Sequence, residues 1–376
     1  MKTDAEVVPP NTHDPRAEDS STKEGRGALP DWLKYGYITP NFTRAVSRAV
    51  EYSVNDFSLS EVAKGLGKKG DAEKYLKRSR NWRNHWNPKQ TSLGFAGFVV
   101  QKYANSSFDY PYDPLQCGGC YWGDPYYEDL PWSYSFNAHH DIKHLIKLAG
   151  GAENFTARLE KFFEPGVYSG NAAFGNTIYN PSNEPAFTTP YLFNFVGRQD
   201  LTVKYSRHAI KAYYNAGTGG IPGEYCKSMR TWLVVFAALS AQYQRQCSHS
   251  LEPNFRDTYA DMLKGNSDAG AMQTYALWSM IGLYPVVTQQ TFLVGSPWFE
   301  YMEIALGGGK KLTITSKGGD QDTKIYVQSL KVNGKAWDRN WVTYDDVFAK
   351  GGTMDFVLGT EPVRWANGTL PLSPAS

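Results

Sequence analysis

The chain has 376 residues, of which 41% are hydrophobic and 20% charged. This length allows about two domains, and the composition excludes a wholly disordered protein. The net charge of +2 gives no general attraction to nucleic acid or to an anionic membrane. No run approaches the ~18 apolar residues of a membrane-spanning helix. Aromatic residues reach 15%, which suits a large core or a surface that stacks on sugar rings.

The first segment, residues 1–30, is rich in Pro, Asp, Ser and Lys. This composition predicts a linker or loop. The segment lacks the apolar stretch of a signal peptide, so the sequence predicts none in this chain. Acceptor motifs for N-glycosylation nevertheless occur at Asn41, Asn105, Asn154 and Asn367. They favour a secretory history.

Residues 31–297 show mainly helical spacing, interrupted by an aromatic, Pro-rich and Gly-rich loop over 101–135. The expected helices carry these apolar sets: Val46, Val50, Val54 and Phe57; Tyr75, Ser79, Trp82 and Trp86; Ile142, Leu145, Ile146 and Ala149; Phe155, Leu159 and Phe162; Leu201, Tyr205 and Ala209; Ala271, Tyr275 and Ser279. Pro88 is expected to end the second of these helices, and Gly282 the last.

Beyond residue 297 the apolar period changes to two. Leu312 and Ile314 alternate with polar residues, and so do Met354, Phe356 and Leu358. Asn333-Gly334 predicts a tight hairpin. The pattern therefore predicts a mainly α chain of paired helices with a C-terminal antiparallel β module over 298–376.

The chain has four cysteines. Cys117 and Cys120 form a close pair, whereas Cys226 and Cys247 lie far from them. A structural zinc site needs a second pair at matching spacing. A local disulfide between Cys117 and Cys120 is therefore favoured over zinc.

Two carboxylates could act as an acid and a base. Glu128 lies in the aromatic loop just before a predicted helix, where burial against rings would raise its pKa and suit a general acid. Asp268 lies at the start of the helix around Ala271. For each residue the plainer alternative is a helix-capping carboxylate. Two separated carboxylates that face one cleft are what an inverting glycosidase requires.

A third polar site is the turn at Asn183 and Glu184, between two prolines. An amide carbonyl and a carboxylate are ligands that Ca²⁺ prefers, and a helix N-cap is the alternative. His140 could contact a sugar hydroxyl or cap a helix. The sequence contains no phosphate-binding Walker loop, no GxSxG and no HExxH.

These segments together resemble glycoside hydrolase family 92. The resemblance rests on Glu128 to Asp141, on Asn183-Glu184-Pro185 with Pro190-Tyr191-Leu192, and on Asn266 to Met272 with Gly282 to Pro285. Further similar segments are 51–57, 296–298 and 327–334, and Phe187 to Pro190 is similar to fungal members. The family comprises calcium-dependent, inverting exo-α-mannosidases, mostly α-1,2-acting, with an N-terminal β-sandwich and an (α/α)6 toroid.

The resemblance implies a role for each matching residue. Glu128 would be the general acid and Asp268 the general base. Asn183, Glu184 and Asp268 would hold Ca²⁺, and Trp132 and His140 would lie near the sugar. The implied substrate is a mannose-containing oligosaccharide or N-glycan. The implied location of the full-length protein is extracellular.

The chain departs from the family pattern in two ways. It lacks the β-sandwich and the first toroid helices, so the resemblance implies a C-terminal fragment with an incomplete toroid over 31–297. Residues 224–265 form an atypical insertion, interpreted as a translated intron or as a surface insertion. The alternatives for function are an inactive fragment, a carbohydrate-binding remnant, and a glucoamylase-like glycosidase that needs no metal.

Overall fold

The computed structural model describes residues 1–9, 25–121, 123–214, 270–320 and 322–376. They divide into two compact units. The first unit comprises residues 1–179, 286–290 and 372–376, and the second comprises 180–285 and 291–371. Asp268 and the insertion over 224–265 lie outside the described residues.

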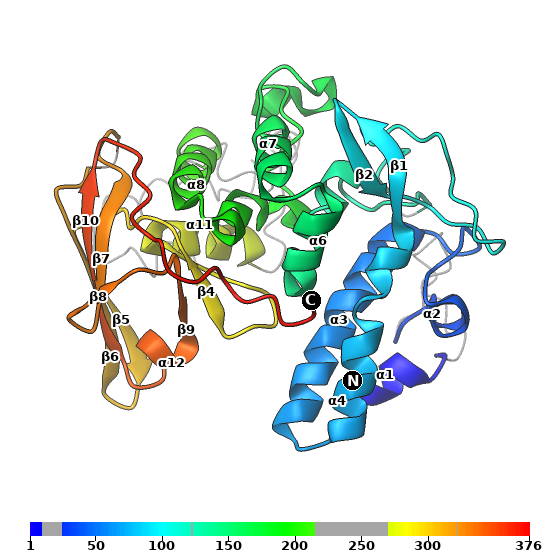
Figure 1. The fold of residues 1–376 in the computed structure, drawn as a ribbon, viewed down its shortest axis with the longest axis horizontal. Helices are drawn as coiled ribbons and strands as arrows, with labels where there is room; N and C mark the ends of the chain where they lie inside the picture. Colours follow the sequence, from blue (N-terminus) through cyan, green and yellow to red (C-terminus); the bar gives the residue numbers. More distant parts are fainter. Residues whose placement is uncertain (10–24, 122, 215–269, 321) are drawn as a thin grey trace, which may run out of the picture. The chain divides into compact units, whose positions relative to one another are not determined.

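The first unit is built mainly from helices (Figure 1). Its elements are α1 (Lys2–Glu6), α2 (Leu29–Tyr35), α3 (Ala45–Gly65), α4 (Lys69–Arg78), η1 (Asn81–His85), β1 (Trp86–Ser92), β2 (Phe95–Val99), α5 (Pro131–Tyr134), η2 (His139–Asp141), α6 (Ile142–Leu148), α7 (Ala152–Phe162) and η3 (Ser169–Phe174). Helices α3 and α4 lie side by side as a helical hairpin. Gly67, with φ +69°, lies in the turn between them and adopts the left-handed backbone that glycine tolerates best.

The core of the first unit combines apolar packing with a buried carboxylate. Ala45, Ala49 and Tyr52 of α3 pack in one cluster with Leu29 and Trp32 of α2. The apolar set that the sequence predicts for this helix is a different one: Val46, Val50 and Phe57 are buried and Val54 is half-buried.

Asp56, further along α3, is fully buried. It accepts hydrogen bonds from Trp32 Nε1 at 3.0 Å, Arg26 Nη1 at 2.8 Å and Arg78 Nε at 2.6 Å. A buried charge needs such partners, and these partners tie α2, α3 and α4 together.

The prediction of a loop over residues 1–30 is wrong for its first residues, which form α1. This helix is short, and tertiary contacts hold it: Ala5 is buried with Leu59 and Tyr75, and Glu6 pairs with Lys74 at 2.7 Å. Isolated helices of this length are unstable in water. Sequence composition therefore could not reveal α1.

The predicted helix through Tyr75, Trp82 and Trp86 is wrong beyond Arg78, where α4 ends. The chain then forms η1 and enters a β-hairpin of β1 and β2. Leu93 and Gly94 at the hairpin turn both have positive φ, as two-residue hairpin loops require. Pro88, expected to end a helix, lies inside β1, as proline can on the edge strand of a two-stranded sheet.

The second unit combines helices with two β-sheets (Figure 1). Its elements are η4 (Glu184–Ala186), η5 (Thr189–Val196), α8 (Gln199–Tyr213), α11 (Ala271–Ile281), β3 (Leu283–Pro285), β4 (Thr291–Val294), β5 (Tyr301–Gly307), β6 (Lys310–Lys317), β7 (Tyr326–Val332), β8 (Lys335–Trp337), β9 (Trp341–Thr343), α12 (Tyr344–Val347) and β10 (Gly352–Gly359). The prediction that Gly282 ends α11 is confirmed, because Gly282 is its left-handed C-cap. The predicted hairpin at Asn333-Gly334 is also confirmed, between β7 and β8.

The larger sheet has the strand order β5-β6-β10-β7-β8. Its neighbours are antiparallel except β6 and β10, which are parallel. The expectation of a purely antiparallel module is therefore wrong at this pair, because β10 lies between β6 and β7 and runs parallel to the first and antiparallel to the second. The β region also begins before residue 298, since β3 pairs with β4, and β4 pairs with β9, in a second sheet. The pairings of β4 with β9 and of β6 with β10 are non-local, and local periodicity does not reveal them.

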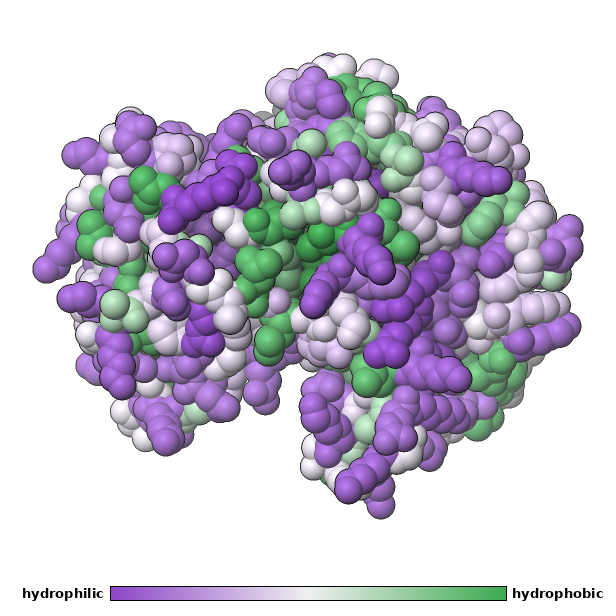
Figure 2. Space-filling model, viewed as in Figure 1, coloured by the Kyte–Doolittle hydropathy of each residue, from purple (hydrophilic) through white to green (hydrophobic). Residues whose placement is uncertain are grey.

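The described elements confirm a mainly helical chain with a C-terminal β module. None of the helices in the described part is both long and apolar enough to span a membrane. Hydrophilic side chains cover much of the face shown in Figure 2.

Candidate active site

The loop that carries Glu128 is held in a defined shape by local bonds. The predicted disulfide between Cys117 and Cys120 is confirmed, and the Glu128 N–H donates to the Cys120 carbonyl at 2.8 Å. Glu128 has φ +67°, a left-handed conformation that costs a residue with a side chain on the order of 1 kcal/mol. The surrounding structure therefore imposes the backbone conformation from which this carboxylate projects.

Helix α3 anchors the same loop. The backbone N–H of Tyr127 donates to Ser47 Oγ at 2.8 Å, and the Val46 N–H donates to the Pro125 carbonyl at 3.1 Å. From the other side, the Tyr134 hydroxyl of α5 donates to the Tyr127 carbonyl at 2.8 Å. Both backbone groups of the residue before Glu128 are thus bound. This fixes the direction in which the chain enters Glu128.

Asp129, which the sequence analysis did not single out, is the second carboxyl group of this loop. It is buried, and its Oδ1 accepts from the Leu130 N–H at 2.7 Å. Among the described residues, none donates a hydrogen bond to its buried Oδ2. Burial, reinforced by the charge of Glu128, raises the pKa of Asp129 to about 7. The only sequence signal for it was the pair of adjacent acids ahead of an apolar Leu-Pro-Trp run.

Trp132 lies in the core rather than at a surface. Its side chain is fully buried, and its indole N–H donates to Ser92 Oγ at 3.0 Å. Edge contacts join it to Phe95 and Phe98, with centroid distances of 5.8 and 5.2 Å. A fully buried ring has no face to offer a sugar. The expectation of sugar contact therefore does not fit this arrangement, and Trp132 instead supports the helix that follows Glu128.

His140 is likewise buried. Its Nε2 lies 2.8 Å from the Ser79 carbonyl, and its ring stacks on Phe57 at 5.4 Å. Burial lowers the pKa of His140, so the neutral imidazole is the favoured form at pH 7. The expected contact with a sugar hydroxyl does not fit here, because the buried imidazole of η2 contacts Phe57 of α3 and the Ser79 carbonyl.

Asn183 and Glu184, in the second unit, lie at the start of η4 and are half-buried. The turn closes with the Ala186 N–H donating to the Asn183 carbonyl at 3.1 Å. An amide oxygen and a carboxylate on a rigid, half-exposed turn fit Ca²⁺ in donor type. Within the described ranges, no three His, Cys, Asp or Glu side chains cluster as a metal site. The third expected ligand, Asp268, lies outside those ranges.

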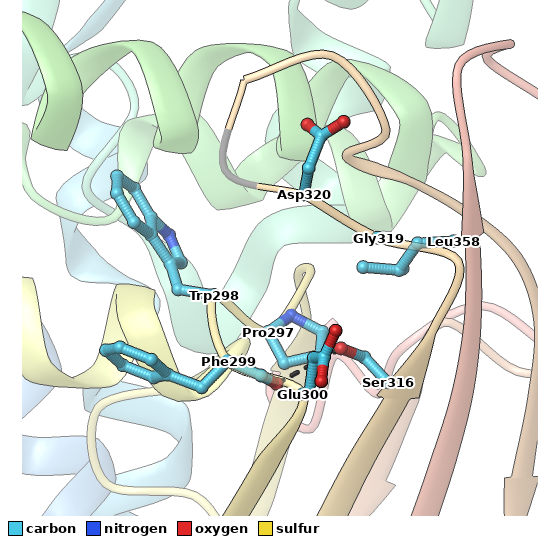
Figure 3. A pocket seen from close by; sticks show the side chains of 8 residues that line it. All are labelled: Pro297, Trp298, Phe299, Glu300, Ser316, Gly319, Asp320 and Leu358. Atoms are coloured by element: carbon cyan, nitrogen blue, oxygen red, sulfur yellow. Dashed lines mark hydrogen bonds between the residues drawn. The ribbon is translucent and has the colours of Figure 1, made fainter.

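The second unit also contains a hollow of about 520 Å³ (Figure 3). It is lined by Pro297, Trp298, Phe299, Glu300, Ser316, Gly319, Asp320 and Leu358. In Figure 3 the Asp320 carboxylate points away from the other lining side chains. It accepts from the N–H groups of Asp322, Thr323 and Lys324, which hold its pKa well below the usual range. A carboxylate held ionised in this way is poorly suited to donate a proton.

The comparisons with known proteins agree on one family. The model of the glycosyl hydrolase family 92 catalytic domain matches residues 1–239 and 235–360. An uncharacterized secreted glycosidase of the fungus Arthroderma benhamiae is 31% identical over 99% of this chain and 43% of its own length. The chain thus spans less than half the length of this relative.

Solved structures of the same family share the fold. A family GH92 alpha-mannosidase from Bacteroides thetaiotaomicron in complex with mannoimidazole superposes with a TM-score of 0.73 at 23% identity, over 92% of this chain and 40% of that one. A GH92 inverting mannosidase from the same bacterium gives a TM-score of 0.71 at 22% identity, over 94% and 43%.

Proposed function

Because the chain belongs to glycosyl hydrolase family 92, we propose that it is an inverting exo-α-mannosidase. Glu128 is the general acid and Asp268 the general base. The substrate is a mannose-containing oligosaccharide or N-glycan with a terminal α-1,2 linkage. The observation that supports this proposal most is the constrained backbone at Glu128. The preceding residue, Tyr127, is hydrogen-bonded through its N–H and its carbonyl, and the Glu128 N–H donates to Cys120. Glu128 itself has a left-handed φ. Strained residues held by their surroundings concentrate at active sites.

In the proposed reaction, Glu128 protonates the oxygen that leaves as the glycosidic bond breaks. The base removes a proton from the water that attacks the opposite face of the sugar. The negative charge of Glu128 adds to burial in favouring the protonated form of the neighbouring Asp129, since two close carboxylates resist ionising together.

Asn183 and Glu184, with Asp268, are the residues proposed to hold Ca²⁺. When bound, the ion would supply a positive charge that orients sugar hydroxyls and the attacking water. The proposed location is extracellular, supported by the secreted relative. The proposed helical architecture is an (α/α)6 toroid, and fungal members of the family are the proposed relatives of the chain.

The test compares leaving groups. Glu128→Gln should lower kcat/KM on a mannobiose by on the order of 100-fold or more, and much less on an aryl mannoside whose phenolate leaves without a proton. Glu153→Gln on α7, an exposed carboxylate, is the control and should leave both rates unchanged. Equal losses on both substrates would remove Glu128 as the acid. Binding of methyl α-mannoside without turnover would instead indicate a carbohydrate-binding protein.

The metal is tested separately. Exhaustive dialysis against EDTA should abolish turnover, and added Ca²⁺ should restore it. Asn183→Ala should weaken Ca²⁺ binding by about tenfold or more in calorimetry. Full turnover after dialysis would exclude the metal and favour the glucoamylase-like alternative.

A further inference from the structure

The disulfide between Cys117 and Cys120 is bound directly to the backbone of Glu128. Only two glycines separate the cysteines, and the disulfide holds their Cα atoms 5.0 Å apart, so it closes a small ring that restricts the backbone within it. Cys120 has φ +54°, a left-handed conformation that a residue with a side chain adopts only at a cost. The Cys120 carbonyl accepts the Glu128 N–H at 2.8 Å. The conformation of this ring therefore determines where the acceptor of the Glu128 N–H lies.

Asp124 holds the peptide unit that carries this acceptor. Its Oδ2 accepts from the Gly119 N–H at 2.8 Å and from the Tyr121 N–H at 2.9 Å. The Tyr121 N–H and the Cys120 carbonyl belong to one planar peptide unit. When Asp124 fixes the N–H end of that unit, it also fixes the direction of the carbonyl that accepts from Glu128.

Asp124 is itself anchored on two sides. Its carbonyl accepts the N–H of Arg44, the residue that precedes α3, at 2.6 Å. Its carboxylate packs closely against Gly118, where an added Cβ would overlap Oδ1. Gly118 also has φ +80°, so both the space and the backbone at this position require glycine. A continuous series of contacts thus leads from the start of α3 through Asp124 and Cys120 to the Glu128 N–H.

We propose that the Cys117–Cys120 disulfide and Asp124, together called the Cys120 clamp, position Glu128 for acid catalysis, and that reduction of the disulfide ends this positioning. The inference rests on the proposed function of Glu128. The clamp transfers no proton to the substrate, because it acts through the backbone of Glu128. A misplacement of a catalytic group by about 1 Å can lower a rate on the order of 100-fold, so a small change in this backbone is enough to affect the acid.

Reduction uses a dithiol, here dithiothreitol, as the donor of two electrons. One dithiothreitol thiolate attacks a cysteine sulfur, which breaks the S–S bond and forms a mixed disulfide, and the second thiolate then displaces that cysteine. Cys117 and Cys120 together gain two electrons and two protons and end as thiols, while dithiothreitol ends as a cyclic disulfide. Gly118 and Gly119 are exposed and Cys120 is half-buried, so a small reductant reaches the ring from solvent. Once the ring is open, the Cys120 carbonyl can turn away from Glu128.

The first experiment measures hydrogen exchange of the full chain and needs no activity. Reduction with dithiothreitol should speed exchange of the Glu128 amide by about tenfold or more, because this N–H loses its acceptor. The Val100 N–H, which donates to the His85 carbonyl at 2.8 Å, is the control amide and should not change. Equal exchange of the Glu128 amide before and after reduction would overturn the inference.

The cysteines are assigned with variants. Cys117→Ser/Cys120→Ser should show the fast exchange of the reduced wild type and no further response to dithiothreitol. Cys226→Ser/Cys247→Ser, which removes the other two cysteines of the chain, should respond to dithiothreitol as wild type does. A response that disappears in the second variant would assign the effect to the wrong pair and overturn the role of the clamp.

The second experiment measures kcat/KM on a mannobiose and on the aryl mannoside. Reduction should lower the value for the mannobiose by about tenfold or more and that for the aryl mannoside by less than about twofold, because only the first leaving group needs the proton of Glu128. Oxidised glutathione, which re-forms the disulfide by thiol exchange, should restore the loss. Asp124→Asn should show the same imbalance between substrates, since a neutral amide accepts more weakly than a carboxylate. Asp113→Asn is the matched control, because Asp113 is exposed in the same loop, and should change neither rate.

The outcomes separate the two proposals. Equal losses on both substrates would show a general structural role for the disulfide and overturn its action through the acid. Unchanged rates after complete reduction would overturn the clamp while leaving Glu128 as the acid. A wild-type chain without α-mannosidase activity would overturn the proposed function and, with it, the catalytic role of the clamp. Hydrogen exchange would then still decide whether the disulfide holds the backbone of Glu128.

Discussion

Different interactions stabilise the interiors of the two units. In the first unit, here called the helical unit, each buried carboxylate binds side chains from several elements. Asp56 binds Arg26, Trp32 and Arg78. Asp141 accepts from Trp82 Nε1 at 3.0 Å and from Arg83 Nε at 2.7 Å.

In the second unit, here called the β unit, the core is an apolar cluster. It includes Leu312 and Ile314 of β6 and Met354, Phe356 and Leu358 of β10. The alternating strands supply this cluster directly, since successive residues of a strand face opposite sides.

The difference teaches where polar specificity is needed. A sheet repeats one pairing rule, so apolar alternation is enough to align its strands. Short helices and a long loop share no ladder of backbone hydrogen bonds, so hydrogen bonds to buried charged groups fix their positions. The loop of Glu128 is likewise held by specific hydrogen bonds rather than by a sheet. Four substitutions test the contrast.

The largest effect is expected at Asp56. Asp56→Ala should lower the free energy of unfolding by about 3–5 kcal/mol, because it removes the buried anion that Arg26 and Arg78 share and leaves Arg78 with Glu6 alone. Asp71→Ala is the control, since it removes the same side chain from an exposed pair with Lys2 and should cost below about 1 kcal/mol. Urea unfolding followed by circular dichroism measures both. Similar losses in the two variants would contradict the special role of the buried carboxylate.

The next effect depends on pH and concerns Asp129. Its pKa of about 7 in the folded state lies above the unfolded value of about 3.9. The stability that its protonated form supplies is therefore complete below about pH 4 and is lost as pH rises to about 7. Asp129→Asn does not titrate. Relative to wild type it should gain on the order of 3–4 kcal/mol between pH 4 and pH 8, measured as unfolding free energy against pH. If the unfolding free energies of wild type and Asp129→Asn change with pH in the same way, Asp129 is ionised in the folded protein.

In the β unit the corresponding test is apolar. Leu312→Ala should cost about 3 kcal/mol through lost burial and an unfilled cavity, because Leu312 is fully buried. Val357→Ala on β10 is the control, since Val357 is 44% exposed and should change stability by about 0.5 kcal/mol. Thermal melts at pH 4 and at pH 8 measure both variants, and the loss in Leu312→Ala should be the same at the two pH values. A curve for Leu312→Ala that depends strongly on pH would break the contrast between the two units.

The smallest effect is expected at a helix cap in the β unit. Thr343 caps α12 by accepting from the Asp346 N–H, and the Asp346 carboxylate accepts from the Thr343 N–H at 2.7 Å. Thr343→Ala should cost about 1 kcal/mol, and Thr343→Ser should restore most of it. Chemical denaturation of the two variants side by side measures the difference. If serine fails to recover stability, the methyl group rather than the cap matters.

The sequence correctly predicts the elements that depend on a local residue pattern. The alternation around Leu312 and Met354, the hairpin at Asn333-Gly334 and the end of α11 at Gly282 are all present. The parallel pairing of β6 with β10 is not a local property, because partner choice depends on where the other strands already lie. The same holds for α1, whose stability comes from Ala5 and from Glu6 with its partners on α4.

For the candidate site, the sequence by itself determined which residues could do chemistry. Glu128 in its aromatic loop and the Asn183-Glu184 turn were identified from residue type and motif, and the disulfide between Cys117 and Cys120 from spacing. Only the tertiary structure decided what surrounds each of these side chains. It buries Trp132 and His140, raises the pKa of Asp129 and brings Ser47 of α3 to the loop. Burial and electrostatic coupling depend on distances between segments far apart in the chain, and a linear sequence does not contain those distances.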